Sequence, residues 1–298
     1  MKTLFHSNGK LLITAEYYVL AGAKALAVPS QYGQSLQYKR EDQNCLLWKS
    51  FDQQGEIWYE GKFELENLLE KGAQKTKIGT KLTQILQATR ALNPTFLSHG
   101  GQVDTHLEFD RHWGLGSSST LISNIAQWAQ VNPFSLLDMT FGGSGYDISC
   151  ASAKSAIHYT KNKLTPEVVP VPFNPPFASN LFFVYQNSKQ NSQAEIERTK
   201  SVPFHDIERM NQLTETITLC NNQAEFNQLL LEHETLVSRY LNREPLQKSQ
   251  FRDFGGQIKS LGAWGGDFML VSGNPESPSY FKSKGYTTIF KFIEILKN

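Results

Sequence analysis

Apolar and polar side chains alternate along residues 103–109, and this period of two predicts a β-strand. Further along, Leu121, Ile125 and Trp128 recur at the spacing of one helix face. Between these two patterns lies the segment GLGSSST, residues 114–120. The sequence therefore predicts a strand, a loop of glycines and hydroxyl side chains, and then a helix.

Similar patterns organise the rest of the chain. A proline-rich segment, residues 165–177, holds five of the twelve prolines and predicts a connector or an edge strand. We place the domain boundary there, with domains at residues 1–170 and 171–298, and expect a mixed α+β protein with two lobes. The expected strands are residues 10–14, 17–20, 25–29, 45–51, 55–65, 180–186 and 267–273. The expected helices are residues 80–91 and two helices within 205–242, and a further helix is expected to start at 192–200. Residues 286–296 fit either a strand or a helix.

Composition narrows the partners. The chain has 298 residues and a formal net charge of +1, which argues against nucleic acid as its main partner. Its three cysteines are widely spaced and indicate neither a disulfide framework nor a zinc site. Residues 11–23 are apolar, but Glu16 interrupts them, so we expect a buried strand rather than a targeting segment. We expect a cytoplasmic protein that does not bind membranes.

The segment at residues 114–120 has two interpretations. Its hydroxyls are good N-caps and its glycines relieve strain in a turn. Alternatively, the N–H groups and dipole of the following helix bind a phosphate that the glycines allow to approach closely. One hydroxyl suffices for a cap and four occur in a row, which favours the phosphate cradle. Neither the Walker A pattern nor the dinucleotide fingerprint is present.

Three other segments carry candidate chemistry. NGKLLITAEYYVL, residues 8–20, places Lys10 at the head of a strand, where its stem covers apolar surface or its ammonium enters a polar site. GGSGYDISCASA, residues 142–153, surrounds Asp147 with small residues, so this carboxylate either caps a helix or approaches a substrate hydroxyl. KSLGAWGGDFMLVSG, residues 259–273, fits a hairpin.

Taken together and in this order, the four segments resemble the GHMP kinases over nearly the whole chain. The first resembles that family's P-G-K-x-x-L-x-G-E-[HY]-x-V-L motif, and GLGSSST is similar to its phosphate loop. SGYD matches the segment with the catalytic aspartate, and SLGAWGGD resembles the last glycine-rich motif. The resemblance implies an N-terminal lobe like domain 2 of ribosomal protein S5, a ferredoxin-like C-terminal lobe, and ATP-dependent phosphoryl transfer.

The resemblance also implies residue roles. Asp147 is the catalytic carboxylate and Lys10 its cationic neighbour. Mg²⁺ is bound by Ser118, and Glu16 is the one motif carboxylate available as a second ligand. The residues implied to wrap the ATP phosphates are Gly114, Leu115, Gly116, Ser117, Ser118 and Ser119. Those implied to line the substrate are Tyr17, Ser144, Gly145, Gly262, Ala263, Gly265 and Gly266.

The match departs from the family in several places. Asp110 and Trp113 alter the start of the phosphate loop, and Tyr17 stands where several members carry histidine. Trp264 replaces a usual glycine, where an indole shrinks the site, stacks on a ligand or blocks catalysis. The expected substrate is phosphomevalonate or mevalonate, because the aspartate precedes an aliphatic residue, and galactokinase is disfavoured. A kinase of another small alcohol and a non-catalytic binding protein stay as alternatives, and a homodimer stays open.

Overall fold

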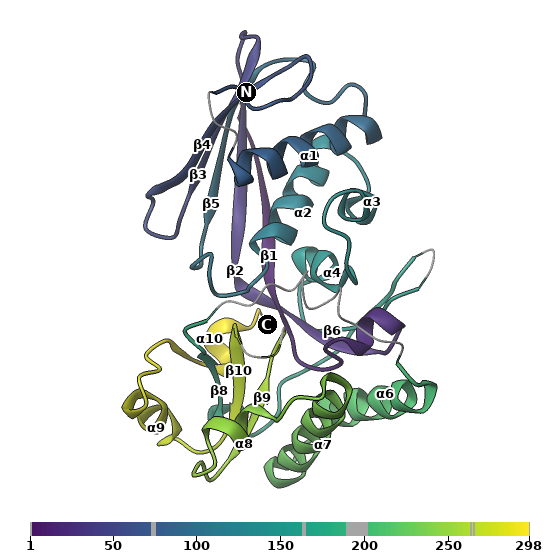
Figure 1. Cartoon of the computed structure of the whole chain (residues 1–298), viewed down its shortest axis with the longest axis vertical. Coiled ribbons are helices and arrows are strands. Elements are labelled where there is room, and N and C mark those ends of the chain that lie inside the picture. The colour runs from purple at the N-terminus through teal and green to yellow at the C-terminus, as the bar shows by residue number, and fades with distance from the viewer. Residues whose placement is uncertain are drawn as a thin grey trace. The chain divides into compact units, whose positions relative to one another are not determined.

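The computed structural model describes residues 2–72, 76–162, 165–188, 202–262, 264 and 266–297 (Figure 1). The chain folds into two compact units that are interleaved along the sequence. Unit 1 comprises Met1–Gly9, Tyr32–Arg111 and Gly116–Ser152, and unit 2 comprises Lys10–Gln31, His112–Leu115 and Ala153–Asn298. The predicted domains, residues 1–170 and 171–298, stay a prediction.

Unit 1 is built on a sheet in which the strands run in the order β4-β3-β5-β2. These strands are β2 (Ala25–Arg40), β3 (Cys45–Phe51), β4 (Ile57–Glu64) and β5 (Gly101–Leu107), and β1 (Lys2–Leu12) also pairs with β2. β3 and β5 are parallel, whereas β3 with β4 and β2 with β5 are antiparallel. The alternation that predicted the strand at 103–109 therefore marks β5, which ends two residues earlier.

Helices cover one face of this sheet (Figure 1). They are α1 (Lys77–Leu92), α2 (Ser117–Ala129), α3 (Pro133–Asp138) and α4 (Tyr146–Ser152), and α2 packs against the other three. Thr76 begins α1 as an N-cap, since its hydroxyl accepts the Gly79 N–H at 2.8 Å. The core between helices and sheet includes Trp48, Phe63 and Ile122, all buried. This apolar contact places the first turns of α2 and α4 on one rigid support.

Unit 2 contains an antiparallel sheet of four strands in the order β11-β8-β10-β9. Its strands are β8 (Leu181–Tyr185), β9 (Gln257–Ser260), β10 (Phe268–Ser272) and β11 (Ile289–Lys291). The helices of this unit are α6 (Phe204–Leu219), α7 (Gln223–Leu241), α8 (Leu246–Gln250), α9 (Ser277–Ser283) and α10 (Phe292–Ile295), with a short turn η2 (Ala178–Asn180). The segment that fitted strand or helix holds both, because β11 runs directly into α10.

Two strands follow unit 1 in the sequence and extend the pairing of β2. β6 (Ile157–Thr160) pairs with residues 25–27 of β2, and β7 (Glu167–Pro170) pairs with β6 at the edge. The edge position explains how β7 accommodates a proline, since a missing N–H is tolerated there. The prediction of a connector or edge strand for 165–177 is confirmed as an edge strand.

One predicted strand is wrong. Residues 17–20 were expected to be extended, yet η1 (Tyr18–Ala21) is a 3₁₀ turn. Ala15 and Tyr17 both have φ of 66°, a left-handed conformation that ends the preceding extended run. The predicted helix start at 192–200 lies outside the described residues.

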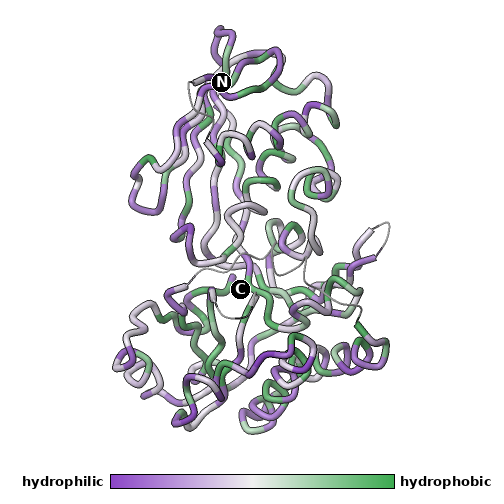
Figure 2. The backbone as a smooth tube through the Cα atoms, viewed as in Figure 1, coloured by the Kyte–Doolittle hydropathy of each residue, from purple (hydrophilic) through white to green (hydrophobic). Residues whose placement is uncertain are grey.

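Figure 2 shows hydrophobic and hydrophilic residues mixed along the helices of both units. In the described part of the chain, no helix has both the length and the apolar character needed to cross a bilayer.

Candidate active site

The first turn of α2 carries the hydroxyl side chains that follow the glycine loop. Gly116 is the N-cap residue with φ of 91°, a conformation that glycine adopts without strain. The hydroxyls of Ser119 and Thr120 donate to the Gly116 carbonyl at 2.9 and 3.1 Å. Those of Ser117 and Ser118 make no hydrogen bond with any described residue. Two of the four hydroxyls thus build the turn, and two are available to a ligand.

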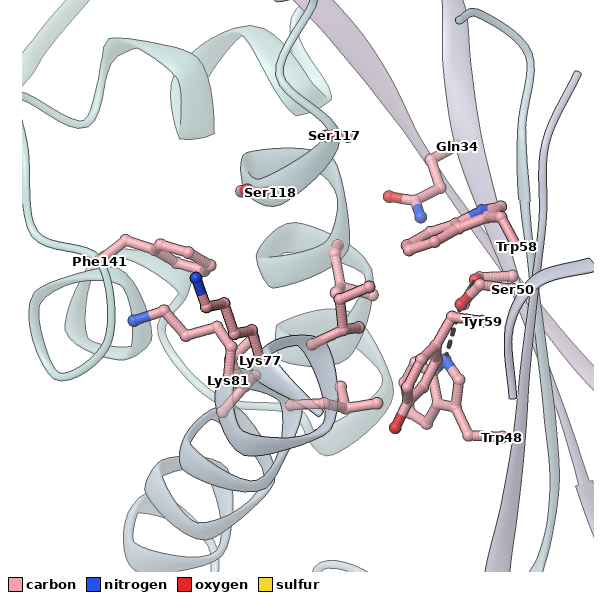
Figure 3. Close-up of a pocket in the computed structure, with 15 residues that line it drawn as sticks. Gln34, Trp48, Ser50, Trp58, Tyr59, Lys77, Lys81, Ser117, Ser118 and Phe141 are labelled. Carbon is pink, nitrogen blue, oxygen red and sulfur yellow. Dashed lines mark hydrogen bonds between the residues drawn. The ribbon is translucent and has the colours of Figure 1, made fainter. Parts of the chain in front are cut away.

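A cavity of about 270 Å³ opens beside this turn, entirely within unit 1 (Figure 3). The sheet contributes aromatic side chains, α1 contributes aliphatic and lysine side chains, and α2 contributes the two serines. The lining residues are Gln34, Trp48, Ser50, Trp58, Tyr59, Lys77, Ile78, Lys81, Leu82, Ile85, Thr105, Ser117, Ser118, Leu121 and Phe141. An apolar cavity with a few polar groups beside a helix N-terminus suits a ligand with a flat ring and an anionic tail.

Hydrogen bonds fix the aromatic wall. The Trp48 indole N–H donates to the Ser50 hydroxyl at 3.1 Å, and the Thr105 hydroxyl donates to the same oxygen at 2.9 Å. The Tyr59 hydroxyl donates to Glu70 at 2.8 Å, and burial together with this carboxylate raises the pKa of Tyr59. Tyr59 is therefore neutral, whereas the Arg111 guanidinium lies 5.4 Å from the centre of the Trp58 ring.

Lysines supply positive charge on the opposite wall. The Lys81 ammonium donates to the Thr140 carbonyl at 3.0 Å and lies 4.4 Å from the centre of the Phe141 ring. Lys77 and Lys81 both line the cavity, and their side chains run from α1 toward Phe141 (Figure 3). The cavity thus combines ring stacking surfaces with cations, as a nucleotide requires.

Asp147 lies in the first turn of α4, a helix that packs against α2. Its carboxylate oxygen Oδ1 accepts the Ile148 N–H at 3.0 Å, and the side chain is half-buried. Gly145, just before it, has φ of 87°. The structure therefore brings the helices of Ser118 and Asp147 together in unit 1, and the bond from Asp147 to the adjacent N–H is not an N-cap bond.

Lys10 and the first half of the glycine loop belong to unit 2. The Lys10 ammonium donates to the Gly114 carbonyl at 2.7 Å, and its backbone N–H donates to the Leu115 carbonyl at 3.0 Å. Lys10 therefore holds the loop directly. Asp147 belongs to unit 1, so a pairing between Lys10 and Asp147 stays a prediction.

Asp267 is a carboxylate that the sequence analysis did not single out. It is 7% exposed and has φ of 57°. Gly114 has φ of 68°, and a methyl group at its Cα would overlap the Asp267 carboxyl group. Gly114 is therefore required twice, for its backbone conformation and for the space that Asp267 fills.

Trp113 anchors the same loop. Its ring meets Phe290 edge-on at 5.1 Å and Phe268 at 6.2 Å, and the Tyr185 hydroxyl donates to the neighbouring His112 carbonyl at 3.2 Å. Within unit 2 the bulky residue thus packs against the sheet, which explains its presence before the loop without a contact to a nucleotide.

Glu16 is buried in unit 2, where it is paired with Lys259 and lies close to His233. Its Oε1 accepts from the Lys259 ammonium, and its Oε2 lies 3.2 Å from Nε2 of His233. Exposed fractions are 1% for Glu16 and 0% for Lys259 and His233. A role for Glu16 as a Mg²⁺ ligand would require breaking this pair, so we leave it out of the cation site proposed below. His233 is a core histidine of α7.

The last glycine-rich segment meets Tyr17. The hydroxyl of Tyr17, a side chain only 7% exposed, accepts the Trp264 backbone N–H at 3.1 Å. Gly262 has φ of 67° and Gly266 is buried, both in unit 2. Ala263 and Gly265 lie outside the described residues, and Ser144 belongs to unit 1 with Gly145.

Sequence reasoning missed the aromatic wall and Lys259. Trp48 and Ser50 alternate on one face of β3, but the pattern of one strand does not tell which strands face a cavity. Only the pairing of β3 with β4 and β5 places Trp58, Tyr59 and Thr105 beside them.

No protein-family model and no curated protein sequence matches the chain. Among solved structures, the mevalonate kinase of Methanococcus jannaschii is similar with a TM-score of 0.71 at 13% identity, covering 97% of each chain. The phosphomevalonate kinase of Streptococcus pneumoniae, in complex with phosphomevalonate and AMPPNP, gives 0.70 at 14%, covering 97% of this chain and 99% of that one. The galactokinase of Lactococcus lactis gives 0.67 at 13%, covering 99% and 93%.

These similarities extend over whole chains at low identity, so they concern the path of the backbone rather than individual side chains. Both the two-sheet architecture and the predicted α+β class are confirmed. The chain has the fold of the GHMP kinases.

Proposed function

We propose that this chain is an ATP-dependent kinase that phosphorylates a small alcohol of the mevalonate pathway, phosphomevalonate or mevalonate. One observation carries the proposal. The aromatic cavity of unit 1 ends at the first turn of α2, where two hydroxyls have no hydrogen-bond partner among the described residues and a helix N-terminus can bind an anion. The similarity to kinases that bind such substrates supports it.

ATP fits the cavity by shape and charge. An adenine ring would lie between the indoles of the sheet and the aliphatic side chains of α1, as apolar ring surfaces favour. The phosphates would then extend toward Gly116, Ser117 and Ser118, where N–H groups bind anions. In this arrangement the loop held by Lys10 determines how closely the phosphates approach.

The transfer itself needs positioning and charge stabilisation more than covalent chemistry. The substrate hydroxyl oxygen forms a bond to the γ-phosphorus while the bond from that phosphorus to the β-phosphate oxygen breaks. The hydroxyl proton passes to Asp147, and ADP leaves. Lys10 adds a positive charge beside the loop and would favour the ionised form of Asp147 when the two approach.

Mg²⁺ fits this site through the nucleotide. Among the described residues, no group of three or more His, Cys, Asp or Glu side chains could hold a metal. Mg²⁺ usually takes few protein ligands, and it neutralises the phosphate oxygens when bound. The exposed hydroxyl of Ser118 would supply one oxygen.

The acceptor-substrate residues stay as the resemblance implies them: Ser144 and Gly145 in unit 1, and Tyr17 with the glycine-rich segment Gly262–Gly266 in unit 2. One observation favours a different outcome. Trp264 is 4% exposed and occupies a place where the resembled family carries glycine, so it reduces the volume available there. The similarity to a galactokinase also keeps a kinase of another small alcohol open. A non-catalytic nucleotide-binding protein is the alternative that Trp264 supports.

The test is ADP release from Mg-ATP with mevalonate, phosphomevalonate, homoserine and galactose. Turnover with a mevalonate-pathway substrate supports the proposal. Asp147→Asn should lower kcat by about 10²–10⁴-fold if this carboxylate takes the proton. The matched control is Asp138→Asn, which changes an exposed carboxylate at the end of α3 in the same unit.

Either alternative has its own signature. Nucleotide binding without turnover on any of the four substrates would contradict the proposal and favour a binding protein. Trp264→Gly would then show whether the indole prevents transfer. Turnover on galactose or homoserine alone would replace the substrate but keep the kinase.

A further inference from the structure

Four ionisable side chains lie together in the interior of unit 2. Their exposed fractions are 1% for Glu16, 0% for His233, 1% for Glu234 and 0% for Lys259. They come from three places: the turn before η1, α7 and β9. Charged groups are rarely buried unless paired, since removing them from water costs several kcal/mol each. None of them takes part in the phosphoryl transfer proposed above.

Their hydrogen bonds assign the charges. The Lys259 ammonium donates to Glu16 and to the Ser260 carbonyl, the latter at 2.9 Å. Nε2 of His233 accepts the Ala15 N–H at 2.9 Å, so its proton is on Nδ1 and the ring is neutral. Burial lowers the pKa of His233 well below its usual value and raises the pKa of Glu234 to about 8. Burial also raises the pKa of Glu16, and the Lys259 ammonium opposes this shift. The cluster therefore holds the Glu16–Lys259 pair beside two neutral groups.

The ion pair holds a strained turn. Ala15 and Tyr17, on either side of Glu16, both have φ of 66°. Such a conformation costs about 1–3 kcal/mol for a residue other than glycine and persists only where surrounding contacts impose it. The contacts here are the Ala15 N–H to His233, Glu16 to Lys259, and the Thr14 hydroxyl to Thr214 at 2.8 Å.

The strained turn at Ala15–Tyr17 also holds the glycine-rich segment that contains Trp264. Tyr17 accepts the Trp264 backbone N–H at 3.1 Å. The indole N–H of Trp264 is buried and has no acceptor among the described residues. The bond to Tyr17 is therefore the polar contact that fixes Trp264 in the described structure. It joins the first and last of the four sequence motifs.

We propose that Glu16 and Lys259 are positioning residues, which hold the strained turn so that Tyr17 sets the place of Trp264 at the acceptor-substrate side of the site. The place of Trp264 at the acceptor side of the site rests on the proposed function, whereas the contact between Tyr17 and Trp264 does not. The cavity proposed for the nucleotide is lined by unit 1 alone, and no member of the cluster lines it. The pair should therefore govern acceptor binding and leave nucleotide affinity unchanged.

The decisive variant removes both charges together. Lys259→Met alone leaves a buried carboxylate unpaired and should cost about 3–5 kcal/mol. Glu16→Gln with Lys259→Met keeps volume without charge and should restore much of that stability. Tyr17→Phe leaves the cluster intact and removes only the hydroxyl that holds Trp264, so it tests the fastening even if the double variant unfolds.

Amide hydrogen exchange measures the fastening without any enzymatic assay. In the double variant and in Tyr17→Phe, exchange at residues 261–268 should accelerate about tenfold or more, while α6 stays protected. The matched control is Arg209→Met with Glu232→Gln, which removes a two-bond ion pair of 2.6 and 2.7 Å between α6 and α7. It should leave exchange at residues 261–268 unchanged.

Kinetics then test the positioning. With the substrate identified by ADP release, KM for the acceptor should rise about tenfold or more in the folded double variant, while the nucleotide Kd stays within about twofold. A folded double variant with native exchange at 261–268 and native KM would overturn the inference. If the wild-type chain turns over no substrate, the proposed function fails, and the exchange result still decides whether the pair holds the segment.

Discussion

The cavity of unit 1 and the buried cluster of unit 2 use opposite physical means. The cavity has neutral walls of indole, phenol and aliphatic side chains, with cations on α1 and unengaged hydroxyls on α2. The cluster is closed to water and filled with ionisable groups whose hydrogen bonds go to one another and to the backbone. The first region has capacity left to bind a ligand. The second region is buried, and its hydrogen bonds join distant segments of the chain.

This difference separates binding residues from positioning residues. Glu16 and Ser118 both belong to motifs that resemble a kinase, and motif membership alone suggests a similar role for both. Burial distinguishes them, since the Glu16 carboxylate is 1% exposed and is paired with Lys259, whereas Ser118 is exposed. Substitutions in the cluster should thus act through stability and local order, and substitutions in the cavity through affinity.

The largest effect should come from the pH dependence of the cluster. Glu234 has a pKa of about 8 in the folded chain against 4.5 when unperturbed, chiefly because it is buried. The folded state keeps a proton that the unfolded state releases, so the free energy of unfolding falls as pH rises from 4.5 to 8, by up to about 5 kcal/mol. Glu234→Gln should remove this loss. The free energy of unfolding of the variant, measured in urea, should therefore exceed that of the wild type by an amount that grows steadily over that pH range.

The neighbouring Glu232→Gln is the control. Glu232 pairs with Arg209, which lowers its pKa, so its contribution is present at neutral pH and is lost as pH falls. Relative to the wild type, Glu232→Gln should therefore lose stability as pH rises, whereas Glu234→Gln should gain it. Parallel pH profiles for Glu234→Gln and the wild type would mean that Glu234 is ionised in the folded chain.

A smaller loss should follow from Gly114→Ala. The methyl group meets two penalties, a left-handed backbone and the overlap with the Asp267 carboxyl group, together about 2–4 kcal/mol. Gly142→Ala separates them, because Gly142 has φ of 63° and no atom within 4 Å of an added methyl group. Thermal unfolding should show the greater loss for Gly114→Ala. Adding Asp267→Gly should recover the difference, and failure to recover it would mean that Asp267 is not what crowds Gly114.

A loss of affinity rather than stability is expected in the cavity. Trp58→Ala removes a half-buried ring from the lining and should weaken ATP binding about tenfold, the magnitude of one lost stacking contact. Calorimetric titration with ATP measures it. Ile57→Ala is the matched control, since Ile57 precedes Trp58 on β4, is exposed and does not line the cavity. Equal ATP affinity for both variants would remove Trp58 from the nucleotide site.

Sequence patterns predicted the parts of this molecule that are local. β5, the start of α2 and the helices of residues 205–242 follow from the period of apolar positions, and the motif order led to the fold. Contacts between distant segments were not predictable in this way. The turn at 14–17 illustrates the limit, because its apolar residues read as a strand whereas His233 and Lys259, over 200 positions later, hold it in a left-handed conformation. The role expected of Glu16 depended on the same contacts.

The smallest effects test whether adjacent hydroxyls of α2 divide between structure and binding. Ser119 donates to the Gly116 carbonyl at 2.9 Å and is 3% exposed, so Ser119→Ala should cost about 1 kcal/mol of stability. Ser118 is exposed and has no partner among the described residues, so Ser118→Ala should leave the unfolding midpoint unchanged while weakening ATP binding in the presence of Mg²⁺. Unfolding curves and ATP titrations are measured on both variants. Ser119→Ala should lose stability, and Ser118→Ala should lose ATP affinity. Two variants that lose stability together and bind ATP normally would show that the whole first turn is structural, and the anion site would then have to lie elsewhere in the loop.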